Sequence, residues 1–262
     1  MLFSNLLNTI YNNINLSLIA KINSPVQTGF YLQASKFQSL PIGIVNAVVD
    51  KAVFPILSTY KTKAEILINY SKFVRYITIF VYPLIFIISA LSSNLIIVLL
   101  GNRWSESGEL LGILIFAGLG STLQYINRNL LKSLGITKLI LRIDTINILI
   151  GLFVLFVVAS RGVYYVAIGV VISSLIGVCI QSVLISITIK YSLKEQMKNI
   201  STAVFISVSI FIVLKLFLFF IHFTPILELV LGGFISIIAF IIASVIFAKK
   251  DVNLFVDNIK LK

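Results

Sequence analysis

Charged and amide side chains recur inside long runs of apolar residues. If these runs cross a membrane, placing a polar side chain within them costs free energy. Lys36, Asp50 and Arg128 each lie within such a run. A full charge at the centre of a bilayer costs at least about 2.5 kcal/mol, so it persists where it faces water, a partner or a ligand. The chemistry that these residues could perform is therefore the non-covalent binding of a polar ligand at membrane depth.

Three helices each carry one polar face when residues are placed at about 100° intervals. Turned toward each other, the faces would line a wet, net basic cleft. The faces consist of Asn5, Asn8, Asn12 and Asn15; of Lys36, Ser39, Gly43, Asn46 and Asp50; and of Ser121, Gln124, Arg128 and Lys132. We expect the ligand to contact Lys36, Asn46, Asp50, Gln124, Arg128, Asn8, Asn12 and Asn15.

A structural role is the alternative for the same residues. Single amides in membrane helices often form hydrogen bonds between helices, worth about 0.6 kcal/mol each. Asp50 could likewise be held in a structural pair with Lys51 or Arg128, and Lys132 could be a charge at the cytoplasmic end of its helix.

The sequence shows no arrangement for covalent chemistry. It has no Walker A motif, no Gly-rich dinucleotide loop, no nucleophile elbow and no paired carboxylates in a shared pocket. His222 has no ligand partners at metal-binding spacing, and Cys179 is the single cysteine, so no intrachain disulfide is possible. We therefore expect no enzymatic activity, no cofactor and no metal.

The composition is that of an integral membrane protein. Of the 262 residues, 59% are hydrophobic and 11% are charged, whereas a soluble domain usually carries about 25% charged residues. The net charge of +12 could suggest nucleic acid binding. Because the basic residues sit in short loops between apolar runs, membrane topology explains the charge instead. We expect membrane lipids as partners and no nucleic acid.

Eight apolar runs of spanning length predict about eight transmembrane helices. A closed β-barrel is the other spanning architecture, and no alternation with a period of two supports it. The predicted fold is an all-α polytopic bundle, with a six-helix lobe at 1–190 and an additional helix pair with a tail at 191–262. The expected helices are 2–20, 32–57, 73–100, 110–131, 139–159, 163–189, 200–220 and 226–247. The second of them lies within a longer stretch, 29–58, that we expect to form one helix.

Basic residues divide unequally between the two ends of these helices. If the first helix leaves the cytoplasm, fourteen Lys and Arg residues lie on the cytoplasmic side, and Lys21, Arg103 and Arg161 lie outside. This positive-inside bias predicts cytoplasmic termini. The fourteen are Lys61, Lys63, Lys72, Arg75, Lys132, Lys138, Arg142, Lys190, Lys194, Lys198, Lys249, Lys250, Lys260 and Lys262.

The first helix departs from this bias. No basic residue precedes it and Lys21 follows it, which alone would orient it the other way. We therefore expect the chain to be the C-terminal part of a longer transporter or one half of a split one, with a second helical lobe as its partner.

Several motifs resemble a known family. The runs KINSPVQTGFYLQASKFQSLPIGIV and VVDKAVFPILSTYK resemble the central helix pair of polysaccharide and O-antigen flippases, of the multidrug/oligosaccharidyl-lipid/polysaccharide exporter superfamily. The segment LLGNRWSESGELLGILIFAGLG resembles the family's Gly-x-x-Trp turn. The likeness covers nearly the whole chain, as the C-terminal lobe of a two-lobed exporter. Asn15 stands where the family leads us to expect an acidic residue.

The resemblance implies a flippase for lipid-linked oligosaccharide of the undecaprenyl-diphosphate type, in the bacterial inner membrane, serving polysaccharide or lipopolysaccharide synthesis. Arg128, Lys36 and Lys51 would then neutralise the diphosphate, amide and Ser side chains would contact sugar hydroxyls, and Asp50 would couple a proton or cation. The alternatives are a Na⁺- or H⁺-coupled multidrug exporter of the same superfamily, and a non-transporting truncated lobe or partner subunit.

Overall fold

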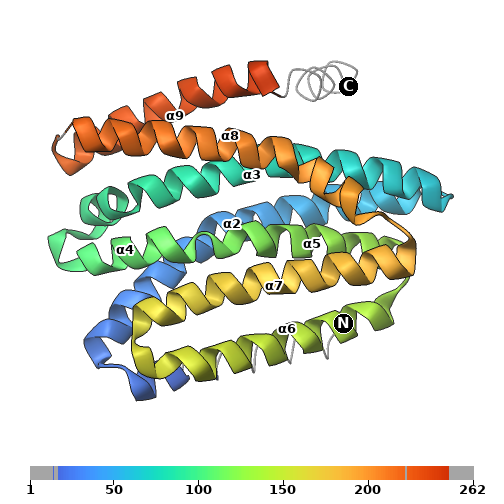
Figure 1. Ribbon diagram of the computed structural model, residues 1–262, viewed down its shortest axis with the longest axis horizontal. Helices are drawn as coiled ribbons and strands as arrows, with labels where there is room; N and C mark the ends of the chain where they lie inside the picture. The colour runs from blue at the N-terminus through green and yellow to red at the C-terminus, as the bar shows by residue number, and fades with distance from the viewer. Residues whose placement is uncertain (1–13, 15–16, 222, 248–262) are drawn as a thin grey trace.

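Long helices running side by side make up the structure (Figure 1). It is a computed structural model that describes residues 14, 17–221 and 223–247. The predicted all-α polytopic bundle is confirmed. The helices are α2 (Pro25–Thr59), α3 (Lys63–Leu100), η1 (Asn102–Trp104), α4 (Ser105–Leu114), α5 (Ala117–Ser133), α6 (Thr137–Val158), η2 (Ala159–Arg161), α7 (Val163–Ile189), α8 (Leu193–Phe220) and α9 (Pro225–Phe247).

Six of the described helices are long and apolar enough to cross a membrane, and η1 and α4 together with α5 form a bent pair that would be a seventh span if the pair crosses as one. The predicted helix at 110–131 is therefore wrong in one respect, because the pair bends by 46°. At the bend, Phe116 N donates to Ile113 O and Gly118 N donates to Ile115 O. These tighter i→i+3 bonds replace the regular α-helical pattern, which a run of apolar letters does not reveal.

The first predicted helix, 2–20, falls almost entirely outside the described residues. Residues 14 and 17–22 are helical. The expected ligand contacts Asn8, Asn12 and Asn15 are outside the described part, so they remain predictions.

Local sequence signals explain where two of the longest helices begin. The Ser24 hydroxyl accepts a hydrogen bond from Gln27 N at 3.2 Å, and Pro25 occupies the first turn of α2. Thr62 and Glu65 form a reciprocal capping box at the start of α3. At the other end of α3, Gly101 adopts φ 91°, a conformation that favours glycine.

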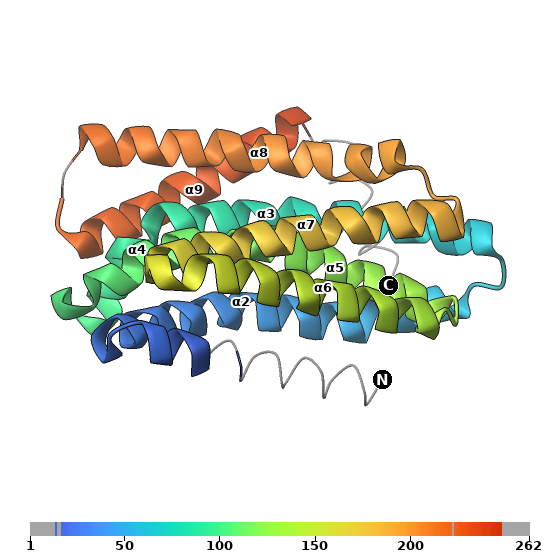
Figure 2. The ribbon, with the colours of Figure 1, turned by 60° about the horizontal axis from the view of Figure 1, so that its bottom comes forward.

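The central helix α3 separates two groups of helices. It packs against α8 and α9 on one side and against α4 on the other, while α5 lies between α2 and α7, and α6 packs on α7. Figures 1 and 2 both show α8 and α9 along one flank. The division of the chain into a six-helix lobe and an added pair stays a prediction.

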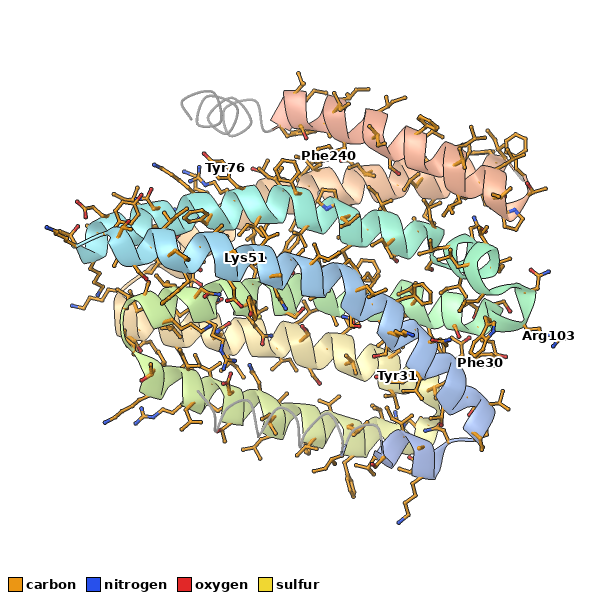
Figure 3. The ribbon with its side chains drawn as sticks, turned by 180° about the vertical axis from the view of Figure 1, so that it is seen from behind. Phe30, Tyr31, Lys51, Tyr76, Arg103 and Phe240 are labelled. Carbon is orange, nitrogen blue, oxygen red and sulfur yellow. The ribbon has the colours of Figure 1, made fainter. Side chains whose placement is uncertain are left out.

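Small residues allow the closest helix contacts. A Cβ on Gly108 would lie 2.6 Å from Ser93 Cα, and one on Gly112 would lie 2.8 Å from Ser92 Oγ. The pair joins α4 tightly to α3, as small residues four apart do in membrane helices. At one end of the bundle, where Figure 3 labels Phe30, Tyr31 and Arg103, the Phe30 ring meets Trp104 edge-on at 5.8 Å.

Large apolar side chains cover the outside of the bundle. Phe153, Phe156, Ile187 and Phe220 are each at least 70% exposed. In water such a surface would be unfavourable, whereas acyl chains solvate it. The exposed apolar surface and the helices of spanning length both indicate a multi-pass membrane protein.

Candidate ligand-binding hollow

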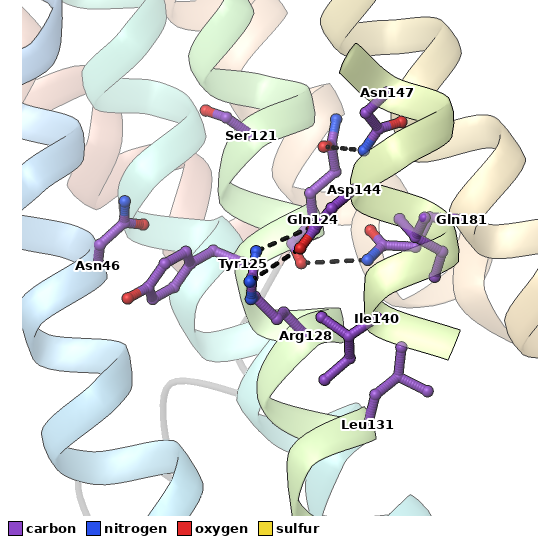
Figure 4. Close-up of a pocket in the computed structure, with 11 residues that line it drawn as sticks. Asn46, Ser121, Gln124, Tyr125, Arg128, Leu131, Ile140, Asp144, Asn147 and Gln181 are labelled. Atoms are coloured by element: carbon purple, nitrogen blue, oxygen red, sulfur yellow. Dashed lines mark hydrogen bonds and ion pairs between the residues drawn. The ribbon is translucent and has the colours of Figure 1, made fainter. Parts of the chain in front are cut away.

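A polar hollow of about 220 Å³ lies among α2, α5, α6 and α7 (Figure 4). Asn46 reaches it from α2, and amide and charged side chains of the other three helices form the rest of its polar lining. Polar groups at this depth in a membrane bundle mark a candidate ligand site. The lining residues are Asn46, Ser121, Gln124, Tyr125, Arg128, Leu131, Ile140, Ile143, Asp144, Asn147 and Gln181.

Arg128 of α5 and Asp144 of α6 form a two-point ion pair in this hollow. Arg128 Nη1 lies 3.0 Å from Asp144 Oδ1, and Nη2 lies 2.9 Å from Oδ2. The two side chains are only 19% and 10% exposed. The paired, planar geometry is the one that makes Arg–carboxylate contacts strong, so each charge offsets the cost of burying the other.

Amides form a second group in the hollow. Asn147 Nδ2 donates to Gln124 Oε1 at 3.0 Å, and Gln124 Nε2 donates to the Ser174 carbonyl at 2.8 Å. Gln181 Nε2 donates to the Gln124 carbonyl at 3.4 Å. Gly177 allows this approach, because a Cβ there would lie within 3 Å of both Asn147 Oδ1 and Gln124 Nε2. The interhelical hydrogen bonding proposed for Gln124 is therefore present.

Two acceptor oxygens in the lining are left without a protein donor. Asn46 Oδ1 and Asn147 Oδ1 are buried and have no hydrogen-bond partner among the described residues. A buried acceptor without a donor is costly. Both oxygens have almost no accessible surface, and Asn147 Oδ1 lies against Gly177, so a ligand donor would reach them only after these side chains turn.

Asp50 lies beside the hollow rather than in its lining. Tyr125 OH donates to Asp50 Oδ2 at 2.5 Å, and Lys132 Nζ lies 3.8 Å from Asp50 Oδ1. The Asp50 side chain is 46% exposed. Neither Lys51 nor Arg128 is its partner here, so the structural pair considered for Asp50 is instead with Lys132 and Tyr125.

Much of the polar face of α2 is exposed. Lys36, Ser39 and Gly43 lie on it and do not line the hollow, and Lys51 is exposed beside it (Figure 3). The structure therefore brings Asn46, Gln124 and Arg128 together, places Asp50 next to them, and leaves Lys36 apart.

The net basic cleft expected from the sequence is not formed by the described residues. Asp144 offsets Arg128, and Asp50 faces Lys132. Asp144 was not among the predicted ligand contacts, although it is the one acidic residue in the run 139–159. The cost of a charge within a membrane helix applies to Asp144 as it does to Arg128. Asn147 and Gln181 were also missed. No group of three His, Cys, Asp or Glu side chains in the described ranges is placed to hold a metal ion.

Comparisons with known proteins agree with the resemblance drawn from the motifs. Residues 1–109 match the family described as "Polysaccharide biosynthesis protein". The teichuronic acid biosynthesis protein TuaB of Bacillus subtilis (strain 168) is 24% identical over 204 residues, which are 76% of this chain and 42% of that protein. The chain thus spans less than half the length of this curated relative. The predicted likeness to a flippase-type polysaccharide biosynthesis family is confirmed.

Proposed function

We propose that this chain is one helical lobe of a transporter that moves lipid-linked oligosaccharide, of the undecaprenyl-diphosphate type, across the bacterial inner membrane for polysaccharide synthesis. One observation supports this most: a polar hollow among the spanning helices that is lined by amide side chains. The match of residues 1–109 to a polysaccharide biosynthesis family supports a role in polysaccharide synthesis.

Sugar head groups need what such a hollow offers. Each hydroxyl stripped of water without a new hydrogen bond costs several kcal/mol. Asn46 Oδ1 and Asn147 Oδ1 have no protein donor, so in this proposal the two side chains turn into the hollow and accept hydrogen bonds from sugar hydroxyls. Gln124, between them along the lining, would complete a row of amides along which a glycan could lie.

The diphosphate needs positive charge, and the chain offers it in two forms. Lys36 and Lys51 are exposed on α2, while Arg128 is held by Asp144. An incoming diphosphate would compete with Asp144 for the same planar guanidinium, because both are oxyanions that bind it in a paired fashion. In this proposal the ion pair stabilises the empty site and opens when the ligand binds.

A second lobe would complete the site. A hollow of about 220 Å³ is smaller than the usual 300–1,000 Å³ of ligand pockets, and the exposed polar face of α2 borders it. Two lobes that rock about such a face would expose the ligand to each side of the membrane in turn. The matched residues make up 42% of that relative, so a non-transporting partner subunit is the alternative.

Export measured in cells tests the proposal. A strain lacking this chain should regain surface polysaccharide when the chain is supplied with its second lobe, and the double variant Arg128→Gln, Asp144→Asn should not restore it at equal membrane abundance. Lys138→Gln, on an exposed residue outside the hollow, is the matched control and should export normally. Full export by the double variant would show that the ion pair has no role in transport. Full export by the chain alone would show that transport does not need a second lobe.

A further inference from the structure

A second hollow, of about 290 Å³, lies where α7 ends and α8 begins against α3. Three basic side chains line it, Arg75, Lys190 and Lys198, and Glu195 is the one acidic residue in the lining. Its formal charge is therefore positive, in contrast to the balanced charges of the ligand-binding hollow. This charge favours an anion.

The wall of this basic hollow is held in place by buried partners. Arg75 Nε donates to Asn199 Oδ1 at 2.7 Å, and Asn199 Nδ2 donates to Tyr191 OH at 2.5 Å. Asn199 and Tyr191 are 4% and 5% exposed. Burial raises the pKa of Tyr191, so its phenol stays neutral near pH 7. The Tyr191 ring meets Tyr70 edge-on at 5.6 Å, a further contact that holds Tyr191 in place.

The basic hollow lies at one end of the spanning helices. α7 ends at Ile189, and Lys190 terminates it in a left-handed conformation with φ 59°. α3 has 38 residues, or roughly 57 Å at 1.5 Å per residue, so it extends well beyond a hydrocarbon layer of about 30 Å. The hollow lies near the start of α3, beside the end of α7, where a helix of this length would leave the hydrocarbon and enter water.

An apolar border adjoins the basic groups. Leu67 and Ile68 of α3 also line the hollow, and Ile68 is 57% exposed. A soluble phosphate would gain nothing from this border, whereas the glycerol backbone and upper acyl chain of a lipid would cover it. The combination of basic residues and apolar residues therefore fits a phosphate carried on a lipid.

We propose that the basic hollow binds the phosphate headgroup of an anionic phospholipid, with Lys190 and Lys198 as its charged contacts and Arg75 held by Asn199 at its inner wall. The positive-inside bias predicts that this end faces the cytoplasm, where anionic lipids attract Lys and Arg next to membrane helices. This site is separate from the ligand-binding hollow and does not depend on the proposed transport function.

Lipid titration of the purified full chain in neutral detergent tests the site. Native mass spectrometry would count bound phosphatidylglycerol, with phosphatidylcholine and inorganic phosphate as separate arms. We expect the double variant Lys190→Gln, Lys198→Gln to bind phosphatidylglycerol about thirty-fold more weakly than the unaltered chain, from the loss of two charges. The matched control Lys61→Gln, Lys138→Gln removes the same charge at exposed positions outside the hollow and should bind normally.

The remaining arms decide the alternatives. Equal binding by the double variant and the control would overturn the site, and equal binding of phosphatidylcholine would overturn its selectivity for an anionic lipid. If the unaltered chain bound inorganic phosphate and the double variant did not, the ligand would be a free phosphate and not a lipid. Lys190 adopts a left-handed backbone, so a substitution there could also affect folding. Lys198→Gln alone is therefore the second variant. If its melting temperature without lipid equals that of the unaltered chain, its weaker lipid binding does not come from misfolding.

Discussion

Arg128 and Asp144 are joined by two contacts, 3.0 Å and 2.9 Å, across the short turn between α5 and α6. The pair ties together two helices that make few other contacts, since α6 packs mainly on α7. This ion pair fixes the orientation of α6, and it means that an anionic ligand must displace Asp144 to bind the guanidinium.

Asp144→Asn should destabilise the protein more than the neutral double variant does. The single change leaves the Arg128 charge without its partner in a largely buried site, and breaking a buried pair costs on the order of 3–5 kcal/mol. The double variant Arg128→Gln, Asp144→Asn removes both charges and should recover most of that loss. Thermal unfolding of the purified variants in detergent measures the difference. Equal melting temperatures for the single and double variants would show that the pair contributes no coupling.

Membrane character, the apolar cores of the helices and the polar face of α5 could be predicted from the sequence, because apolar runs and a 3.6-residue period are local properties. The predicted starts at 73 and 200 were too late, because the polar first turns of α3 and α8 begin at Lys63 and Leu193. The predicted helix at 163–189 agrees with α7. The pairing of Arg128 could not be predicted in this way, because it depends on how α6 rotates against α5. The bend at Ile115 was likewise hidden, since its tighter hydrogen bonds occur within an unbroken apolar run.

Gly177→Ala should disturb the amide group without unfolding the bundle. A Cβ at Gly177 would lie 2.8 Å from Asn147 Oδ1 and 2.9 Å from Gln124 Nε2. Both atoms are ends of flexible side chains, so they would shift and weaken the Asn147–Gln124 hydrogen bond, at a cost of about 1 kcal/mol. We expect a small fall in melting temperature and a clear loss of polysaccharide export. Gly233→Ala, with nothing within 4 Å of its Cβ, is the control, and equal export by both variants would contradict the role of these amides.

Gly120→Ala should damage packing instead. Its Cβ would lie 2.5 Å from the Ser174 carbonyl oxygen, a backbone atom of α7 that cannot rotate away. Forcing α5 and α7 apart should cost on the order of 1–3 kcal/mol, as overpacking does in other cores. Gly43→Ala on α2 meets nothing within 4 Å, so its melting temperature in detergent should stay close to that of the unaltered chain. If both variants melted alike, the close approach of α5 to α7 would not limit stability.

Thiol labelling should distinguish the wet side of α2 from its lipid side. In a Cys179→Ser background, Asn46→Cys would place a thiol in the polar hollow, and Ile44→Cys would place one on a surface that is 68% exposed. Maleimides react with the thiolate, which forms in water and is suppressed in hydrocarbon. We therefore expect a hydrophilic maleimide to label Asn46→Cys in intact membranes and to spare Ile44→Cys, although the latter position is the more exposed. Rapid labelling of Ile44→Cys together with protection of Asn46→Cys would mean that α2 presents the opposite face to water, and the transport proposal would then lose its site.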